Sequence, residues 1–256
     1  AELAIQALEN GKHCVVEKPM AVSLEQARAM ERKAKETGLM LTVYQNRRWD
    51  GWYLETRKLI AEGKLGDIYE AEFFWGDYVS PASWGEWRAD KAKAGGTLFD
   101  WGAHMADWLL GVVPGRVKSV RATKQNRVWN DYTIDDEMCA TVFFDSGAVG
   151  RIEVSYICCQ PKPLFRISGT KGSVVQLPGP DNKMAVACVE NGRKVEYTVS
   201  YQNHERVYNF YDNVAAHLAR GEELQVKPAQ CRQAIAILDT AEKSAEAGEE
   251  LPVPND

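Results

Sequence analysis

The chain has 256 residues, of which 45% are hydrophobic and 26% charged, and its formal net charge is −5. It is long enough to bury the core of one large domain or of two smaller ones. The negative charge and the lack of a basic run argue against nucleic acid or a membrane surface as the main partner, and no apolar stretch approaches the ~18 residues of a membrane span. The six cysteines form no C-x-x-C pair, which is typical of reduced thiols in a cytoplasmic protein.

The first predicted elements alternate between helix and strand, which is the pattern of a parallel, doubly wound sheet. They are a helix over residues 1–11, a strand over 13–17, a helix over 23–37 and a strand over 39–45. Ser23 and Gln26 form a capping box at the start of the second helix. Two strands cannot make such a sheet alone, because both faces of a parallel sheet need cover. We therefore expect residues 1–46 to be the C-terminal part of a domain whose first part lies outside this chain.

From Trp49 the pattern changes to that of a second domain, residues 47–256. A helix over 51–62, a strand over 68–75, an irregular aromatic loop and a helix over 97–110 come first. The strands and helices predicted after them cover residues 116–125, 137–145, 149–158, 164–169, 172–177, 183–190, 193–200, 204–219 and 228–247, the last two being helices. Turn signals such as "DSGA", "GTKG" and "ENGR" separate the strands. Strands joined by tight turns predict a mostly antiparallel sheet with helices on one face, so the fold class is mixed α/β and α+β.

The strand at 149–158 predicts contact between subunits. Its sequence, "VGRIEVSYIC", places apolar residues on both faces, and the chain offers few helices to cover a broad sheet. An exposed apolar sheet face of that size is an interface. We expect a homodimer, or a homotetramer formed as a dimer of dimers.

The first candidate site is the end of the strand at 13–17, where Glu17, Lys18 and Pro19 follow an apolar run. Most lysines after a strand are solvated, and a proline can simply begin the next connection. In open parallel sheets, however, ligands bind at the carboxyl ends of the strands, where Glu17 and Lys18 fall. The residues alone leave the two interpretations equal.

The second candidate site is the segment "GGTLFDWGAHMADWLLG". Asp100, His104 and Asp107 are spaced to share one face of the predicted helix. A histidine that accepts a proton beside a carboxylate is a recurring acid–base unit, although such a pair is more often a structural hydrogen bond. The spacing also occurs in metal sites, but no second ligand cluster accompanies it, so we predict no metal.

Seven of the eight tryptophans lie between Trp49 and Trp108, and most are expected to pack in the core. Trp84 and Trp87 differ, because they lie in the loop just before the second candidate site. Their aromatic faces there suit the apolar C–H face of a pyranose or cyclitol ring. This favours a sugar-like polyol as substrate.

Taken together, the two candidate sites and the motifs around them resemble one family, the Gfo/Idh/MocA oxidoreductases. The motifs occur in the family's order: "ALENGKHCVVEKPMAVSLEQA", "NRRWD", "GKLGDI", "WR", "GGTLFDWGAHMADWLLG", "IDDEM", "FDSGAVGRIEVS" and "ISGTKGSV". The resemblance implies a Rossmann domain that binds NAD or NADP, followed by an α/β domain with a large open sheet that packs against another subunit. The glycine motif G-x-G-x-x-G is absent, since no two glycines stand one residue apart. We therefore expect roughly a hundred residues of the Rossmann domain, on the family's proportions, to be missing from this chain.

The resemblance also implies roles for residues. His104 would be the acid–base group, Asp100 would bind the substrate and poise His104, and Lys18 would contact both the nicotinamide ribose and a substrate hydroxyl. The cofactor would contact Glu17, Lys18, Pro19 and Arg47, and the substrate would contact Lys18, Arg47, Trp87, Arg88, Asp100 and His104. We expect Lys18 and His104 to face one cavity, with Asp100 pointing into it, Trp87 at its border and Arg47 approaching from the crossover between the domains.

Three functions from different classes remain open. The favoured one is an NAD(P)-dependent oxidoreductase that acts on a CH–OH group of a sugar, cyclitol or related polyol. A glycosidase or lyase that oxidises its substrate transiently would use the same residues. A non-catalytic binding protein would explain the absent glycine motif, but it would not explain the presence of Lys18, Asp100 and His104 together.

Overall fold

The computed structural model describes residues 1–203 and 206–255. Its first residues form a small parallel sheet between helices. Strands β1 (Cys14–Val16) and β2 (Leu41–Val43) pair in parallel. They alternate with helices α1 (Glu2–Glu9) and α2 (Leu24–Thr37), which confirms the predicted order. Ser23 caps α2 by accepting a hydrogen bond from the Gln26 backbone amide at 3.3 Å, as the sequence predicted.

The rest of the chain is built on a nine-stranded sheet with the order β10-β9-β8-β7-β3-β6-β5-β4-β11. Its one parallel pair among the described residues joins β3 to β6, and the other neighbours are antiparallel. The strands are β3 (Ile68–Gly76), β4 (Val117–Gln125), β5 (Glu137–Phe144), β6 (Val149–Ser155), β7 (Phe165–Gly169), β8 (Gly172–Gln176), β9 (Lys183–Glu190), β10 (Arg193–Ser200) and β11 (Leu251–Pro252). The mixed α/β fold with a large, mostly antiparallel open sheet is confirmed, and only β11 was not predicted.

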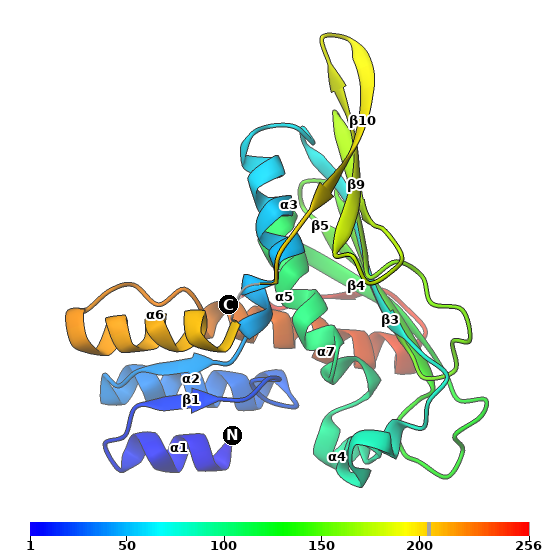
Figure 1. The fold of residues 1–256 in the computed structure, drawn as a ribbon. Helices are drawn as coiled ribbons and strands as arrows, with labels where there is room; N and C mark the ends of the chain where they lie inside the picture. Colours follow the sequence, from blue (N-terminus) through cyan, green and yellow to red (C-terminus); the bar gives the residue numbers. More distant parts are fainter. Residues whose placement is uncertain (204–205, 256) are drawn as a thin grey trace.

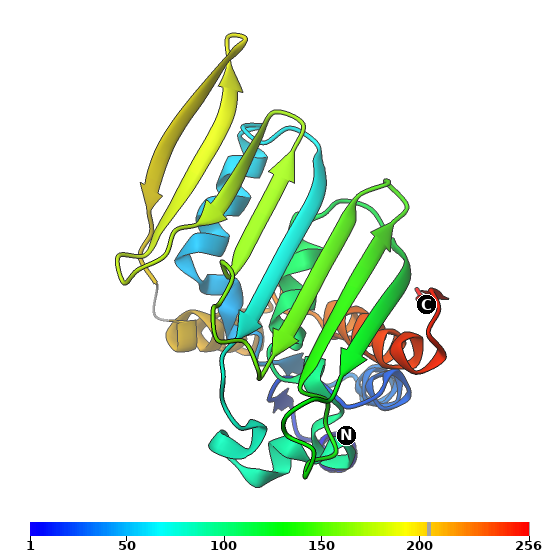
Figure 2. The ribbon, with the colours of Figure 1, turned by 90° about the vertical axis from the view of Figure 1, so that its right-hand side faces the viewer.

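Helices cover one face of this sheet. Figure 1 shows α3 (Gly51–Ala61), α5 (Gly102–Val112) and α7 (Pro228–Ala247) on that side, and Figure 2 shows the other face open. The strands alternate buried and outward residues, as the period of two requires. Gly150 in β6 lets α5 approach closely, because a Cβ there would lie 2.5 Å from Leu109 Cδ2.

The last two helices join the small sheet to the large one. Helix α6 (Arg206–Arg220) packs against the 3₁₀ turn η1 (Asn46–Trp49), and α7 packs against α2, α5 and β4. The Thr42 hydroxyl donates to the Val226 carbonyl at 2.8 Å, and Arg232 of α7 pairs with Glu31 of α2 at 2.5 Å. The start predicted for α6, at residue 204, lies outside the described residues.

The helix predicted over 97–110 is wrong at its start. A 3₁₀ turn η4 (Thr97–Phe99) comes first, Asp100 leaves the helical conformation at ψ −80°, and α5 begins at Gly102. The carbonyl of Asp100 accepts from Lys18 Nζ at 3.1 Å, and the His104 amide bonds to the Trp101 carbonyl instead. Asp100, His104 and Asp107 therefore do not share one helix face, because only His104 and Asp107 belong to α5.

Short helices also replace the irregular aromatic loop. They are η2 (Pro81–Trp84), η3 (Glu86–Ala89) and α4 (Lys91–Ala94). A further 3₁₀ turn, η1 (Asn46–Trp49), follows β2. The Ser80 hydroxyl and the Asp90 carboxylate accept from the Ala82 and Ala92 amides, so local capping stabilises these short turns.

The strand 149–158 places apolar residues mainly on one face, and the half-buried Val149 lies on the other. Within β6, Gly150, Ile152 and Val154 are buried under the helices, whereas Arg151 and Glu153 point to the open face. Arg151 pairs there with Glu72 of β3 at 2.9 Å, so the middle of the open face is largely polar. An interface on this face therefore cannot be argued from apolar area alone.

Candidate active site

The site begins at the carboxyl end of β1, where Glu17, Lys18 and Pro19 leave the small sheet. The Lys18–Pro19 peptide bond is cis. Lys18 Nζ donates to Asp100 Oδ1 at 2.6 Å and to the Asp100 carbonyl at 3.1 Å. An ion pair thus joins the strand end to the segment before α5, 82 positions away in sequence. Each of its two side chains is 20% exposed.

A second cation holds the other oxygen of Asp100. Arg88 NH1, from η3, donates to Asp100 Oδ2 at 2.5 Å. Burial by itself would raise the pKa of the Asp100 carboxyl, but the Lys18 ammonium and the Arg88 guanidinium outweigh it, and the pKa is lowered. Asp100 is therefore kept as a carboxylate that holds two cations at the site.

His104 lies in the first turn of α5 and is 4% exposed. Its Nδ1 is 2.9 Å from Gln45 Oε1, and Gln45 Nε2 donates to the Ala103 carbonyl at 3.2 Å. The imidazole stacks on Trp108 of the same helix with a centroid separation of 6.0 Å, and Trp101 contacts it edge-on at 6.2 Å. The ring is therefore fixed by packing as well as by hydrogen bonding.

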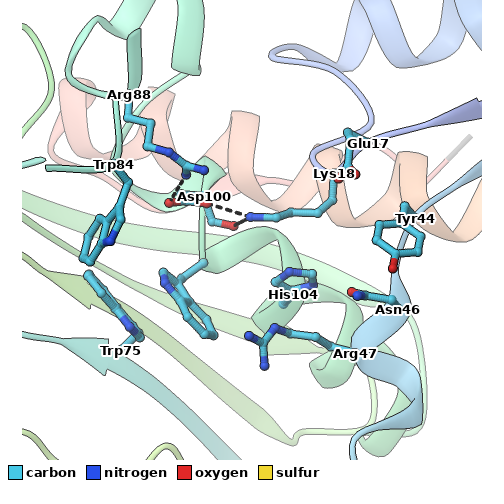
Figure 3. A pocket seen from close by; sticks show the side chains of 11 residues that line it. Glu17, Lys18, Tyr44, Asn46, Arg47, Trp75, Trp84, Arg88, Asp100 and His104 are labelled. Carbon is cyan, nitrogen blue, oxygen red and sulfur yellow. Dashed lines mark hydrogen bonds and ion pairs between the residues drawn. The ribbon is translucent and has the colours of Figure 1, made fainter. Parts of the chain in front are cut away.

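Figure 3 shows Lys18, Asp100 and His104 around one cavity, whose volume is about 460 Å³. Its lining comes from both halves of the chain: Glu17, Lys18, Tyr44, Asn46, Arg47, Trp75, Trp84, Arg88, Asp100, Trp101 and His104. Lys18 and His104 face the same cavity, as expected, and Asp100 lies between Lys18 and Arg88. Arg47 approaches from η1, at the crossover between the two sheets. What each residue does chemically stays a prediction.

Aromatic side chains form one wall of the cavity. Trp75, at the end of β3, stacks on Trp101 with a centroid separation of 5.6 Å, and Trp84 contacts Trp75 at 5.9 Å. The Arg47 guanidinium lies 4.5 Å from the Trp101 ring centroid. The cavity therefore offers flat apolar surfaces beside charged and hydrogen-bonding groups.

Trp87 was expected to border this cavity and instead lines a smaller neighbour of about 240 Å³. The smaller cavity shares Glu17, Lys18, Arg88 and Asp100 with the larger one, and Phe99, Tyr156 and Pro19 complete much of its wall. The Arg88 guanidinium stacks 4.7 Å over the Trp87 ring, so Trp87 supports the arginine that holds Asp100. Trp84 ends η2 and Trp87 lies in η3, and the two side chains line different cavities.

Asp107 forms an ion pair with Arg48 that joins separate segments of the fold. Its carboxylate accepts two hydrogen bonds from Arg48, at 2.8 Å and 2.5 Å, and Arg48 also donates to the Gln225 carbonyl. Burial alone would lower the pKa of Arg48, but Asp107 raises it overall. This ion pair ties η1 to α5 and to the segment before α7, and it lies away from the cavity lining.

Several lining residues were missed by the sequence analysis. They are Tyr44, Asn46, Trp75 and Trp101. Gln45, which lies behind the wall and contacts His104, was missed as well. Tyr44 to Asn46 follow β2 as Glu17 to Pro19 follow β1, so the rule that ligands bind at strand carboxyl ends could have identified them. No sequence signal marked Trp75, because its place at the cavity depends on the pairing of β3 with β6.

Within residues 1–203 and 206–255, no group of three or more His, Cys, Asp or Glu side chains is placed so that it could hold a metal ion. No helix in the same ranges has both the length and the apolar composition needed to cross a bilayer.

Comparison with solved structures supports the fold. An NAD-binding protein from Listeria innocua has a TM-score of 0.83 and 26% sequence identity, over 98% of this chain and 78% of the solved chain. An oxidoreductase domain protein from Kribbella flavida has a TM-score of 0.84 and 22% identity, over 99% and 77% of the two chains.

Among curated proteins, relatives include two enzymes of Bacillus subtilis. Its NADP-dependent scyllo-inositol 2-dehydrogenase is 38% identical over 134 residues, which are 52% of this chain and 37% of that enzyme. Its NAD-dependent scyllo-inositol 2-dehydrogenase is 32% identical over 178 residues, 68% of this chain and 50% of the enzyme. The 1,5-anhydro-D-fructose reductase of Ensifer adhaerens is 30% identical over 68% of this chain and 52% of its own length. The chain thus matches roughly a third to a half of the length of these relatives.

Two family models match separate parts of the chain. The model of an oxidoreductase family with an NAD-binding Rossmann fold matches residues 1–45. The model of the GFO/IDH/MocA C-terminal domain matches residues 53–175. The resemblance drawn from the motifs is therefore confirmed, and the chain belongs to the Gfo/Idh/MocA family of oxidoreductases.

Proposed function

We propose that the protein is an NAD(P)-dependent oxidoreductase that acts on a CH–OH group of a sugar, cyclitol or related polyol. The observation that carries this proposal is the single cavity lined by Lys18, Asp100 and His104, which come from the end of β1 and from both sides of the start of α5. The printed names of the relatives, inositol dehydrogenases and a sugar reductase, support the same class.

The residues present fit one end of a nicotinamide cofactor. Glu17, Lys18 and Pro19 follow β1 at its carboxyl end, and Glu17 and Lys18 line both cavities. We assign the nicotinamide end to these residues and to Arg47. The glycine motif that binds the pyrophosphate is not in the sequence, so the chain's own residues account only for the end near the reaction. When bound, NAD or NADP supplies hydride transfer.

The chain's residues supply the proton chemistry and the positioning. In our proposal, His104 accepts the hydroxyl proton as the carbon is oxidised, which is a step that a general base typically accelerates by ~10²–10⁴-fold. Lys18 donates a hydrogen bond to the same oxygen and stabilises the negative charge that develops on it. Asp100 holds Lys18 in place together with Arg88.

The substrate class rests on the walls of the cavity. Trp75, Trp84 and Trp101 present aromatic surface, while Arg47 and Asn46 add donors beside His104. An apolar ring face with several hydroxyl groups on its edge matches such a lining. A volume of about 460 Å³ has room for a monosaccharide or cyclitol.

The test is an activity assay of the whole protein with NAD⁺ or NADP⁺ and a panel of inositols, monosaccharides and glycosides. We expect reduced cofactor to accumulate with at least one free polyol. His104→Asn should lower kcat by ~10²-fold or more with little change in cofactor affinity, because it removes the base and keeps the size of the side chain. Glycoside cleavage without net reduced cofactor would identify the redox-assisted glycosidase or lyase instead. Absence of both activities with every substrate would favour a binding protein.

Three further assignments accompany this proposal. We place the domain boundary at residue 46, with residues 1–46 as the cofactor-binding part and 47–256 as the substrate-binding and subunit-contact part. The two family models on either side of that position support it. A cytoplasmic location is supported by the six cysteines, all of which are free thiols. We also propose a homodimer or homotetramer.

A further inference from the structure

Gln45 connects the end of β2 to the start of α5. Its side chain is 3% exposed, and its backbone is fixed on both sides, since its amide donates to the Val43 carbonyl at 2.7 Å and its carbonyl accepts from the Arg48 amide at 3.2 Å. The side-chain amide makes two further bonds, to the Ala103 carbonyl at 3.2 Å and to His104 Nδ1 at 2.9 Å. Gln45 is therefore held firmly where it meets the imidazole.

Only one orientation of this amide satisfies both contacts. The Ala103 carbonyl can only accept a hydrogen bond, so the NH₂ group of Gln45 must face it. Oε1 then faces His104 Nδ1, and because this oxygen carries no hydrogen, Nδ1 must be the donor. A neutral imidazole has one N–H group, so the lone pair is on Nε2.

We infer that Gln45 is a positioning residue that fixes His104 in the tautomer with the proton on Nδ1 and the lone pair on Nε2. The assignment of the tautomer follows from the hydrogen bonds of Gln45. Its consequence for the reaction rests on the proposed function. A general base must present a lone pair to the proton that it removes, and the nitrogen that does so is set by the hydrogen bond that the other nitrogen makes. The contacts of the imidazole with Trp108 and Trp101 keep the ring plane from turning.

The group that meets Nδ1 of the imidazole is an amide. The charged groups that line the same cavity are Glu17, Lys18, Arg47, Arg88 and Asp100. Replacing Gln45 by an uncharged side chain leaves all of these charges in place. Gln45→Met keeps the length of the side chain and removes its bonds to His104 and to the Ala103 carbonyl, so it tests the amide without changing the charge of the cavity.

The first experiment reads the tautomer directly. Protein labelled with ¹⁵N in its histidines gives long-range ¹H–¹⁵N correlations that distinguish a protonated from an unprotonated ring nitrogen. The sequence has four histidines, and His104→Asn assigns the signal of interest. We expect Nδ1–H and unprotonated Nε2 in the wild-type protein. At a pH at which the imidazole is neutral we expect the same in Gln45→Glu, because a carboxylate also accepts from Nδ1, although it cannot replace the bond to the Ala103 carbonyl. In Gln45→Met we expect the form with Nε2–H to become populated.

The second experiment measures turnover of the same variants. Gln45→Met should lower kcat by ~10-fold or more, less than the loss in His104→Asn, while KM changes by no more than about twofold. Gln45→Glu should restore most of the lost kcat. A role in stability alone would lower the melting temperature of Gln45→Met without this split between kcat and KM.

The outcomes separate the two proposals. A wild-type spectrum with Nε2–H, or a Gln45→Met protein with unchanged tautomer or turnover, would overturn the role of Gln45. If Gln45→Met does not fold, the spectra of the wild-type protein and of Gln45→Glu still decide the tautomer. If the tautomers are as expected but no polyol is oxidised, the assignment of Gln45 stands and the proposed function fails.

Discussion

At the scale of single residues, the carboxylate of Asp100 is the group whose charge state the site depends on. Lys18 and Arg88 each hold one of its oxygens, and the pKa of the carboxyl group is lowered in the folded protein despite its burial. A carboxyl group with a lowered folded pKa stabilises the fold at pH values above its unfolded pKa of ~3.9. That contribution is lost as the pH falls through the folded pKa.

Asp100→Asn should therefore lower the free energy of unfolding at pH 7 by on the order of 1–3 kcal/mol, since two charge-assisted hydrogen bonds are lost. The difference between variant and wild type should shrink as the pH falls from the unfolded pKa of ~3.9 through the lowered folded pKa, because the wild-type carboxyl group is then protonated as well. Urea unfolding at a series of pH values measures both effects.

The matched control is Asp67→Asn, because Asp67 is exposed in the turn before β3. It should leave the free energy of unfolding within ~0.5 kcal/mol of the wild-type value. A constant difference between Asp100→Asn and wild type from pH 7 down to pH 2 would show that the ionised carboxylate does not stabilise the fold.

At the scale of elements, the position of α5 decides where His104 lies. The helix packs on β6 at Gly150, where a Cβ would lie 2.5 Å from Leu109 Cδ2. Leu109 is fully buried, so it has little room to move.

Gly150→Val should consequently destabilise the protein by ~1–3 kcal/mol, as overpacking of a tight core contact does. Chemical denaturation measures the loss. Arg151→Val is the control, because it puts the same side chain one residue later, on the open face of β6, and removes only the surface ion pair with Glu72, worth ~0–1 kcal/mol. Equal losses in the two variants would mean that the contact between α5 and β6 is not tight.

At the scale of the whole molecule, the open face of the large sheet is the surface that no described helix covers (Figure 2). The hairpin of β9 and β10 also projects beyond α3 (Figure 1), and β10 is the edge strand of the sheet. The half-buried side chains of Phe143 and Val149 lie on the open face. Glu72 forms ion pairs with Arg151 and Arg166 on the same face. A polar face with ordered ion pairs can bury area against a second copy with the same charges.

We predict that light scattering at micromolar concentration gives the mass of a dimer or tetramer. Glu72→Arg should shift the mass toward the monomer, because it places three arginines together on the open face. Glu62→Arg, at the end of α3, should not shift the mass. Circular dichroism checks that both variants are folded. A monomer mass for the wild-type protein would refute the prediction.

The sequence by itself determined the order of the elements, the mostly antiparallel sheet and the family. Hydrophobic periodicity and turn residues are local signals, so they placed α7 at Pro228–Ala247 and nearly every strand within a few residues. The two motifs around Lys18 and His104 predicted one shared cavity through the resemblance to the family, because residue types and the strand-end rule alone left the question open.

Only the tertiary structure decided how those residues meet. The break before α5 depends on Lys18 reaching the Asp100 carbonyl across 82 positions, and no local pattern contains that contact. The place of Trp87 on the smaller cavity depends on the path of η3, and the contact between Gln45 and His104 depends on the segment after β2 meeting the start of α5. Contacts between distant segments are set by packing of the whole chain, whereas a sequence pattern reports only which face of its own element a residue occupies.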